Sequence, residues 1–345
     1  MKKKYIMIIL VIIITSVLSA CSEKKETINV FNFGEYIDES VLKTFEEETG
    51  IKVKYDTFAT NEDMYVRLKQ GSDSYDVVFI SDYMIERSIK EDYLEKINWE
   101  NIPNSKYINP IFKNLIFDPK DEYSAPYTWG TMGIIYNTKL IKDKLTSWND
   151  LWNEKYAGDI LMLNSQRDTL GVALMNLSYS MNTRNEKELL EARDLLIDQK
   201  PLVYAYLGDD IKDALIAEEG SIGVVWSGDA VYMKEENPDL KYIIPKEGTN
   251  LWFDSMVIPK STKNKEGAEK FINFLLRPDI AQLNSEFTGY SSPIPEAVKN
   301  LDISIQEDPV SYPSEEVIKN TEIFRDPSDI LYKYDEIWTE IISSE

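Results

Sequence analysis

The sequence contains no histidine and a single cysteine, Cys21. The absence of histidine excludes Ser-His-Asp and Cys-His catalysis, and it excludes His-rich metal sites. One cysteine can form neither an intrachain disulfide nor a cysteine metal cluster. We therefore expect a protein without a metal or a cofactor, and not an enzyme.

Positive charge is also scarce. The chain has 38 Lys and Arg residues against 60 Asp and Glu residues, and a formal net charge of -22 over 345 residues. Such acidity argues against nucleic acid as a partner, because phosphates would be repelled. It would draw small cations toward the surface. The same acidity also serves solubility, so it does not define a ligand by itself.

The start of the chain resembles a bacterial lipoprotein signal. Lys2, Lys3 and Lys4 precede an apolar run over residues 5–17, which is shorter than the about 20 residues of a spanning helix. Small residues then precede Cys21, as in a lipobox. This resemblance implies a signal peptide over residues 1–20, lipid on Cys21 and a short tether over residues 21–26. The alternative is a simple signal anchor with an incidental cysteine.

Strand and helix patterns alternate from residue 27 onward, which predicts an α/β fold with mostly parallel sheets flanked by helices. Asp38 and Gly50 are expected to bound the first helix, Asn61 to cap the second, and Ser147 to cap residues 148–152. The predicted strands are residues 28–33, 51–55, 77–80, 159–163, 202–206 and 222–226. The other predicted helices are residues 167–181, 186–199, 209–219 and 261–276.

The length fits two α/β lobes with cores of their own. We place the first lobe at residues 27–130 plus 253–298, and the second at residues 131–252 plus 299–345. In such sheets ligands lie beyond the carboxyl ends of the strands. The recurrent content there is an aromatic ring with a carboxylate, as in Glu35 with Tyr36 and Asp254 with Trp252.

This pairing suits a cationic ligand. A carboxylate accepts charge-assisted hydrogen bonds from an ammonium group. An aromatic face attracts the same cation, with about 0.5–2 kcal/mol for each contact, and covers neighbouring methylenes. A polyamine carries ammonium groups separated by short methylene chains, so a matching cleft needs several carboxylates walled by Trp and Tyr. Because a buried charge is costly unless it is paired, the number of carboxylates should follow the number of amines.

A series of short motifs occurs in order along the whole mature chain. They are residues 30–36 (VFNFGEY), 48–53 (ETGIKV), 75–78 (YDVV), 127–131 (YTWGT), 147–152 (SWNDLW), 252–255 (WFDS), 258–259 (IP), 271–279 (FINFLLRPD) and 289–290 (GY). In this order and spacing the chain resembles the spermidine/putrescine-binding proteins of bacterial ABC importers. The resemblance implies a two-lobed periplasmic-binding-protein fold of type II that closes over a polyamine.

The resemblance also implies the residues of the cleft. The ligand-binding residues would be Phe33, Glu35, Tyr36, Ser81, Tyr83, Asp168, Trp226, Trp252, Asp254 and Tyr290, with Gly34, Asp82 and Ser165 as further candidates. Glu35, Asp168 and Asp254 would bind ammonium groups, and the rings would pack on methylenes or hydrogen-bond amines. Taken singly, each of these side chains is more often a core or loop residue than a ligand contact.

The chain departs from the family pattern at four positions. Phe33 replaces a usual Trp, Gly34 a Ser or Thr, Ser165 an Asp and Phe324 a Gln. These changes remove polar partners from the cleft and leave the preferred ligand length open. Asp82 and Asp229 could supply replacement charge or could serve as helix caps.

Three functions stay open on the residues alone. The first is a monomeric binding protein that delivers a polyamine to the membrane subunits of an ABC importer, lipid-anchored on the outer face of the cytoplasmic membrane or in the periplasm. The second is a surface glycosidase that uses paired carboxylates such as Glu35 and Asp254. The third is the same fold with a thiamine-like cation, a sugar or a metal chelate as its ligand.

Overall fold

The computed structural model describes residues 26–71 and 74–344. The predicted signal peptide, the lipidation site Cys21 and nearly all of the tether lie outside these residues. In the part of the chain that is described, no helix combines the length and the apolar character that a bilayer crossing requires.

The described strands form one continuous ten-stranded sheet with the order β2-β1-β3-β9-β4-β7-β5-β6, in which β10 pairs with β9 and β8 with β4. The strands are β1 Thr27–Phe33, β2 Lys52–Phe58, β3 Val77–Ser81, β4 Ser124–Asn137, β5 Ile160–Leu163, β6 Val203–Leu207, β7 Ile222–Trp226, β8 Leu240–Ile243, β9 Thr249–Val257 and β10 Thr321–Glu322.

The sheet is parallel toward its two ends and antiparallel in its middle. Strand β1 pairs in parallel with β2 and β3, and β5 does so with β6 and β7. Strands β4 and β9 pair with each other and with their neighbours β7 and β3 in antiparallel fashion. The α/β class is thus confirmed, and the two parallel halves are joined through β4 and β9 instead of forming separate sheets.

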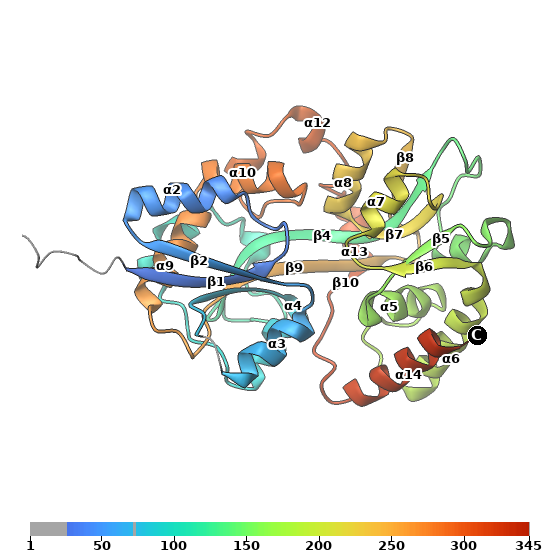
Figure 1. Cartoon of the computed structure of the whole chain (residues 1–345), viewed down its shortest axis with the longest axis horizontal. Coiled ribbons are helices and arrows are strands. Elements are labelled where there is room, and N and C mark those ends of the chain that lie inside the picture. Colours follow the sequence, from blue (N-terminus) through green and yellow to red (C-terminus); the bar gives the residue numbers. More distant parts are fainter. Residues whose placement is uncertain (1–25, 72–73, 345) are drawn as a thin grey trace, which may run out of the picture.

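Helices cover both faces of the sheet (Figure 1). They are α2 Glu39–Thr49, α3 Asn61–Gln70, α4 Asp82–Lys90, α5 Gln166–Asn176, α6 Glu186–Gln199, α7 Ile211–Ile216, α8 Ser227–Glu236, α9 Lys265–Leu275, α10 Pro278–Thr288, α11 Pro295–Val298, α12 Ile303–Gln306, α13 Glu315–Lys319 and α14 Leu331–Ser343. Local chemistry sets several ends. The Asp38 carboxylate accepts from the Ser40 N–H at the start of α2, and Gly50 ends that helix with a φ of 73°.

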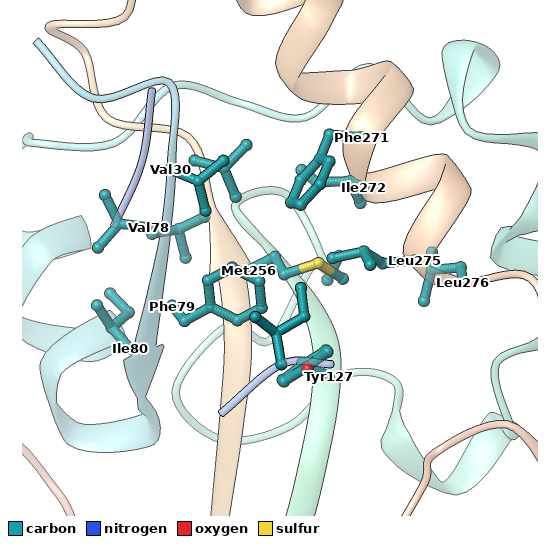
Figure 2. Packing of buried hydrophobic residues seen from close by; sticks show 14 of the residues in the cluster. Val30, Val78, Phe79, Ile80, Tyr127, Met256, Phe271, Ile272, Leu275 and Leu276 are labelled. Atoms are coloured by element: carbon teal, nitrogen blue, oxygen red, sulfur yellow. The ribbon is translucent and has the colours of Figure 1, made fainter. Parts of the chain in front are cut away.

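Two large hydrophobic cores lie along the sheet. The first gathers residues between positions 28 and 129 and between 251 and 297, and the second gathers residues between 132 and 242 together with Val310 and Phe324. Figure 2 shows part of the first core, where Phe271, Ile272 and Leu275 of α9 pack against side chains of the central strands such as Phe79 and Met256. A smaller cluster fills the space between α5, α6 and α14.

The molecule therefore has two halves connected by β4 and β9, which run side by side from one half into the other (Figure 1). The boundaries predicted at residues 130/131 and 252/253 fall inside these two strands. The division of the chain between the lobes stays a prediction, but the connection has a clear mechanical meaning. A pair of hydrogen-bonded strands can bend while it keeps the two halves in register.

Candidate ligand-binding site

The predicted site residues lie where strands end between the two cores. Strand β1 ends at Phe33, β3 at Ser81 and β7 at Trp226, and the middle of β9 carries Trp252 and Asp254. The rings of Phe33, Tyr36, Trp252 and Tyr290 pack with the first core, and Trp226 packs against both cores. The topology thus brings the residues from both halves to one place.

The central carboxylate belongs to Asp254, a residue that is 6% exposed. The Tyr36 hydroxyl donates to Asp254 Oδ2 at 2.5 Å, and the Thr128 hydroxyl lies 2.8 Å from the Tyr36 oxygen. Because the Tyr36 proton points to Asp254, Thr128 donates to Tyr36. Burial raises the pKa of Asp254, and interactions with the Ser81 and Tyr36 hydroxyls offset part of that increase.

Aromatic rings wall this carboxylate. Tyr290 packs edge-on against Trp252, with 5.1 Å between ring centroids, and against Tyr36 at 5.4 Å. A β-carbon at Gly130 would come within 2.5 Å of the Trp252 indole, so the missing side chain lets that ring lie flat on β4. Phe33 packs against Tyr36 at 5.3 Å and extends the same wall.

Two buried polar atoms of this group have no hydrogen-bond partner among the residues that the structure describes. They are Asp254 Oδ1 and the indole nitrogen of Trp252. Buried polar groups are nearly always satisfied, and an unpaired carboxylate oxygen is especially costly. An ammonium group beside Asp254 would satisfy the free oxygen and would neutralise the buried charge.

A second buried carboxylate, Asp168, lies in the first turn of α5. The Ser165 hydroxyl donates to Asp168 Oδ2 at 2.6 Å, and the Trp226 side chain also hydrogen-bonds to this carboxylate. Burial raises the pKa of Asp168 to about 6, despite these hydrogen bonds and the nearby charge of Arg167. This group comes from the second half of the molecule, so carboxylates face the cleft from both sides.

Tyr83 lies near Asp168 and is held by neighbours from both halves. Its hydroxyl donates to Glu62 Oε1 at 2.9 Å, and its ring faces Phe324 edge-on at 6.5 Å. The Arg167 guanidinium stacks over Phe324 at 4.5 Å. Phe324 therefore fills this end of the site with an apolar ring and a covering cation, where the family pattern has an amide.

Glu35 lies apart from the buried carboxylates. Its backbone has a φ of 50°, which a residue with a side chain seldom adopts, and its side chain is 85% exposed. The adjacent Gly34 is also exposed, and no atom would meet a β-carbon there. Glu35 is thus placed at the rim of the site and is paired with Lys212, whose ammonium lies 3.8 Å away.

Three other predicted residues have partners that favour positioning roles. The Asp82 oxygens accept the backbone N–H groups of Tyr83 at 2.7 Å and Phe253 at 3.1 Å. The Ser81 hydroxyl accepts from the Asn61 amide at 2.9 Å. Ser165 caps α5 through the Asp168 N–H. Direct contact of these side chains with a ligand stays a prediction.

Sequence reasoning missed two neighbours of the site, Thr128 and Lys212, and assigned a third only in part. Thr128 lies in the motif at residues 127–131 but was given no role, and Lys212 lies in no motif, because the partners of both are distant in the sequence. Asp229 follows β7 and was recognised only as possible replacement charge or a cap. The structure places it inside the first turn of α8, where Asp229 Oδ1 accepts from the Tyr290 hydroxyl at 3.0 Å.

The arrangement suits the binding of a cation, with no covalent bond made or broken. Buried carboxylates, tyrosine hydroxyls and tryptophan rings converge, and no group of three carboxylates or thiolates in the described residues is close enough to hold a metal ion. Two α/β halves, joined by paired strands and carrying the binding groups on both sides of their junction, define a two-lobed ligand-capturing protein.

The chain belongs to the bacterial extracellular solute-binding proteins, whose family model matches residues 40–311. It is therefore an exported solute-binding protein. The spermidine/putrescine-binding periplasmic protein of Escherichia coli K12 is 37% identical over 325 residues, which cover 94% of this chain and 93% of that protein.

Solved structures support the same assignment. The spermidine/putrescine ABC transporter substrate-binding protein PotD of Streptococcus pneumoniae, in complex with calcium and HEPES, has a TM-score of 0.82 and 39% identity over 92% of this chain and 98% of that chain. The TpPotD lipoprotein of Treponema pallidum has a TM-score of 0.83 and 28% identity over 92% and 99% of the two chains. The predicted family and two-lobed fold are confirmed.

Proposed function

We propose that this protein captures a polyamine of the putrescine or spermidine type outside the cell and delivers it to an ABC importer. The relatives named for spermidine and putrescine cover nearly the whole chain, which supports this ligand class. The site supports it independently, because it carries buried carboxylates from both halves, Asp254 and Asp168, with aromatic rings beside them.

One observation carries the proposal. Asp254 is buried, and its Oδ1, which can only accept, has no hydrogen-bond partner in the described residues. A sugar hydroxyl would satisfy the oxygen but would leave the buried negative charge uncompensated. An ammonium group supplies both the hydrogen bond and the positive charge.

Capture would proceed by closure of the two lobes. Asp254 and Tyr36 bind from the first lobe, and Asp168 and Trp226 bind from the second. A ligand that contacts both sides favours the closed state by its differential affinity for that state. The bending would take place in β4 and β9, which are the strands shared by the two lobes proposed above.

The proposed location of the protein rests on the signal-like sequence at residues 1–20 and on Cys21. We propose that lipid on Cys21 anchors the mature chain to the membrane, with residues 21–26 as a tether. A related chain from Treponema pallidum is named a lipoprotein, which supports this proposal. The closed protein, acting as a monomer, would then dock on the membrane subunits of the importer.

The direct test is calorimetry on the soluble form that starts after Cys21. We expect putrescine or spermidine to bind with micromolar or tighter affinity, about -8 kcal/mol or better. Neutral sugars of similar size and a thiamine-like cation serve as comparison ligands. Absence of any response to polyamines, or turnover of a glycoside by the purified protein, would refute the proposal.

A further inference from the structure

Lys212 is a cation that the protein itself places in the cleft. It lies in α7, and its ammonium nitrogen is 3.8 Å from Glu35 Oε2 and 3.8 Å from Asp229 Oδ1. Glu35 follows β1 in the first half of the molecule, whereas Lys212 and Asp229 belong to the second. One lysine side chain thus bridges carboxylates on opposite sides of the cleft, which is the interaction expected of a ligand amine.

The bridge sits at one end of the row of binding groups. The side chain of Lys212 is 20% exposed and that of Asp229 is 10% exposed, whereas that of Glu35 is 85% exposed, so the bridge joins the interior of the site to its rim. Asp229 also accepts from the Tyr290 hydroxyl, and the Tyr290 ring packs on Trp252. Lys212 is therefore connected to the inner site around Asp254 through Asp229, Tyr290 and Trp252.

The carboxylates of the cleft divide into two kinds. Glu35 and Asp229 already face the Lys212 ammonium group. Asp254 and Asp168 are hydrogen-bonded by neutral hydroxyls, those of Tyr36 and Ser165. Asp82 is also buried, but both of its oxygens accept backbone N–H groups. The Arg167 charge lies near Asp168 without forming an ion pair with it. Since buried carboxylates need compensating charge, Asp254 and Asp168 remain for the ligand, and two carboxylates match two amines.

We propose that the Lys212 ammonium group occupies the outermost amine position of the cleft, between Glu35 and Asp229, and so selects a diamine over a longer triamine. This inference rests on the proposed polyamine function. A third amine directed to Glu35 would meet a fixed positive charge instead of a free carboxylate. It could bind there only by displacing the lysine from both of its partners.

The test compares putrescine with spermidine by calorimetry on the wild type, Lys212→Met and Lys234→Met. Methionine keeps much of the length of the side chain and removes its charge. Lys234 is a matched control, since it lies on α8 in the same half, is 31% exposed and pairs with Asp308 at 2.8 Å. We expect Lys212→Met to raise the affinity for spermidine relative to putrescine by about tenfold, and Lys234→Met to leave the ratio unchanged.

An unchanged ratio in a folded Lys212→Met protein, or a wild type that prefers spermidine, would overturn the inference and leave polyamine binding intact. A wild type that binds neither amine would instead refute the proposed function. A crystal structure of the wild type with putrescine tests the same point without a substitution. The inference requires the Lys212 nitrogen to remain between Glu35 and Asp229, and a ligand nitrogen found there would contradict it.

Discussion

At the scale of single residues, the two oxygens of Asp254 have different surroundings. Oδ2 accepts a short hydrogen bond from Tyr36, whereas Oδ1 is buried and has no partner. The hydrogen bond from Tyr36 orients the carboxylate, and the free Oδ1 leaves it able to bind a ligand. Asp254 thus combines a fixed position with an unsatisfied charge, which is the condition for strong recognition of a cation.

Asp254→Asn should weaken binding of putrescine by about 2 kcal/mol, or roughly thirtyfold. The substitution keeps the shape of the side chain but removes the charge that pairs with the ammonium group. Calorimetry measures the change. Asp302→Asn is the control, because Asp302 caps the short helix α12 through the Ser304 N–H and asparagine can also cap. Equal affinity of Asp254→Asn and the wild type would refute the assigned role.

The sequence singled out Tyr36, Trp252, Asp254 and Tyr290, partly from strand order and partly from the family resemblance. The structure places them together, because Tyr36 hydrogen-bonds to Asp254 and the rings of Tyr36 and Trp252 both pack against Tyr290. Their contact with a ligand stays a prediction. The bridge of Lys212 to Glu35 could not be predicted. It depends on how α7 is placed against the loop after β1, and no local pattern encodes a contact between segments so distant in the sequence.

At the scale of elements, α8 meets the end of α10 at a very close contact. A β-carbon at Gly228 would lie 2.0 Å from Cδ1 of Tyr290, and the Gly228 carbonyl oxygen would lie 2.7 Å from a β-carbon at Gly289. Real β-carbons do not approach other atoms this closely. The two halves can therefore meet here only because both positions are glycine.

Gly228→Ala should hold the two halves apart, because Tyr290 is fixed by Trp252 and Tyr36 and cannot turn away freely. We expect putrescine to bind about tenfold more weakly or worse, since overpacking costs about 1–3 kcal/mol. Small-angle scattering at saturating putrescine should also show a larger radius of gyration.

Gly208→Ala is the matched control for this variant, since the nearest atom to its added β-carbon, in Asp210, is 3.8 Å away. It should behave as the wild type in both measurements. If Gly228→Ala bound putrescine normally and became equally compact, close contact at α8 would have no part in closure.

The periodic elements were predicted better than the central ones. Residues 186–199 form α6 as expected, and Ser147 caps the turn at residues 148–152, which is a 3-10 helix. The prediction that Asn61 caps α3 was wrong. The Thr60 hydroxyl accepts from the Asp63 N–H, and Asn61 is the first residue of the helix. Strands β4 and β9 are buried on both faces and show no alternation, so their pairing could not be derived from the pattern.

At the scale of the whole molecule, two buried carboxyl groups make the stability of the protein depend on pH. Burial raises the pKa of Asp168 to about 6 and that of Asp229 to about 6, although Lys212 and the Tyr290 hydroxyl lower the latter in part. Both groups would titrate near 3.8 in the unfolded chain. Between pH 3.8 and about 6, these two carboxyl groups are therefore protonated in the folded protein without ligand and charged in the unfolded chain.

This difference predicts opposite effects of pH on stability and on binding. For the free protein, these two groups contribute stability that is complete below pH 3.8 and is lost as pH rises through about 6. An ammonium ligand beside Asp168 favours the charged form of this carboxylate, so binding should release a proton near pH 6 and weaken as pH falls from about 7 to about 5. Each bound proton corresponds to at most about 1.4 kcal/mol per pH unit.

Calorimetry of putrescine binding near pH 6, in two buffers of different ionisation enthalpy, measures the released protons. The same titration near pH 8 is the control, because both carboxylates are then charged before the ligand arrives. Equal heats in the two buffers near pH 6 would contradict the raised pKa values. Urea unfolding of the free protein near pH 4 and near pH 7 checks the effect on stability.

The place of β9 in the sheet also determines when the protein can fold. This strand lies between β3 and β4, yet it is made only after residue 248, long after both of its neighbours. A nascent chain shorter than this leaves two strand edges open and cannot complete its first lobe. The first lobe thus cannot close before most of the chain has been synthesised, which is an order of events compatible with an export route that passes unfolded polypeptide.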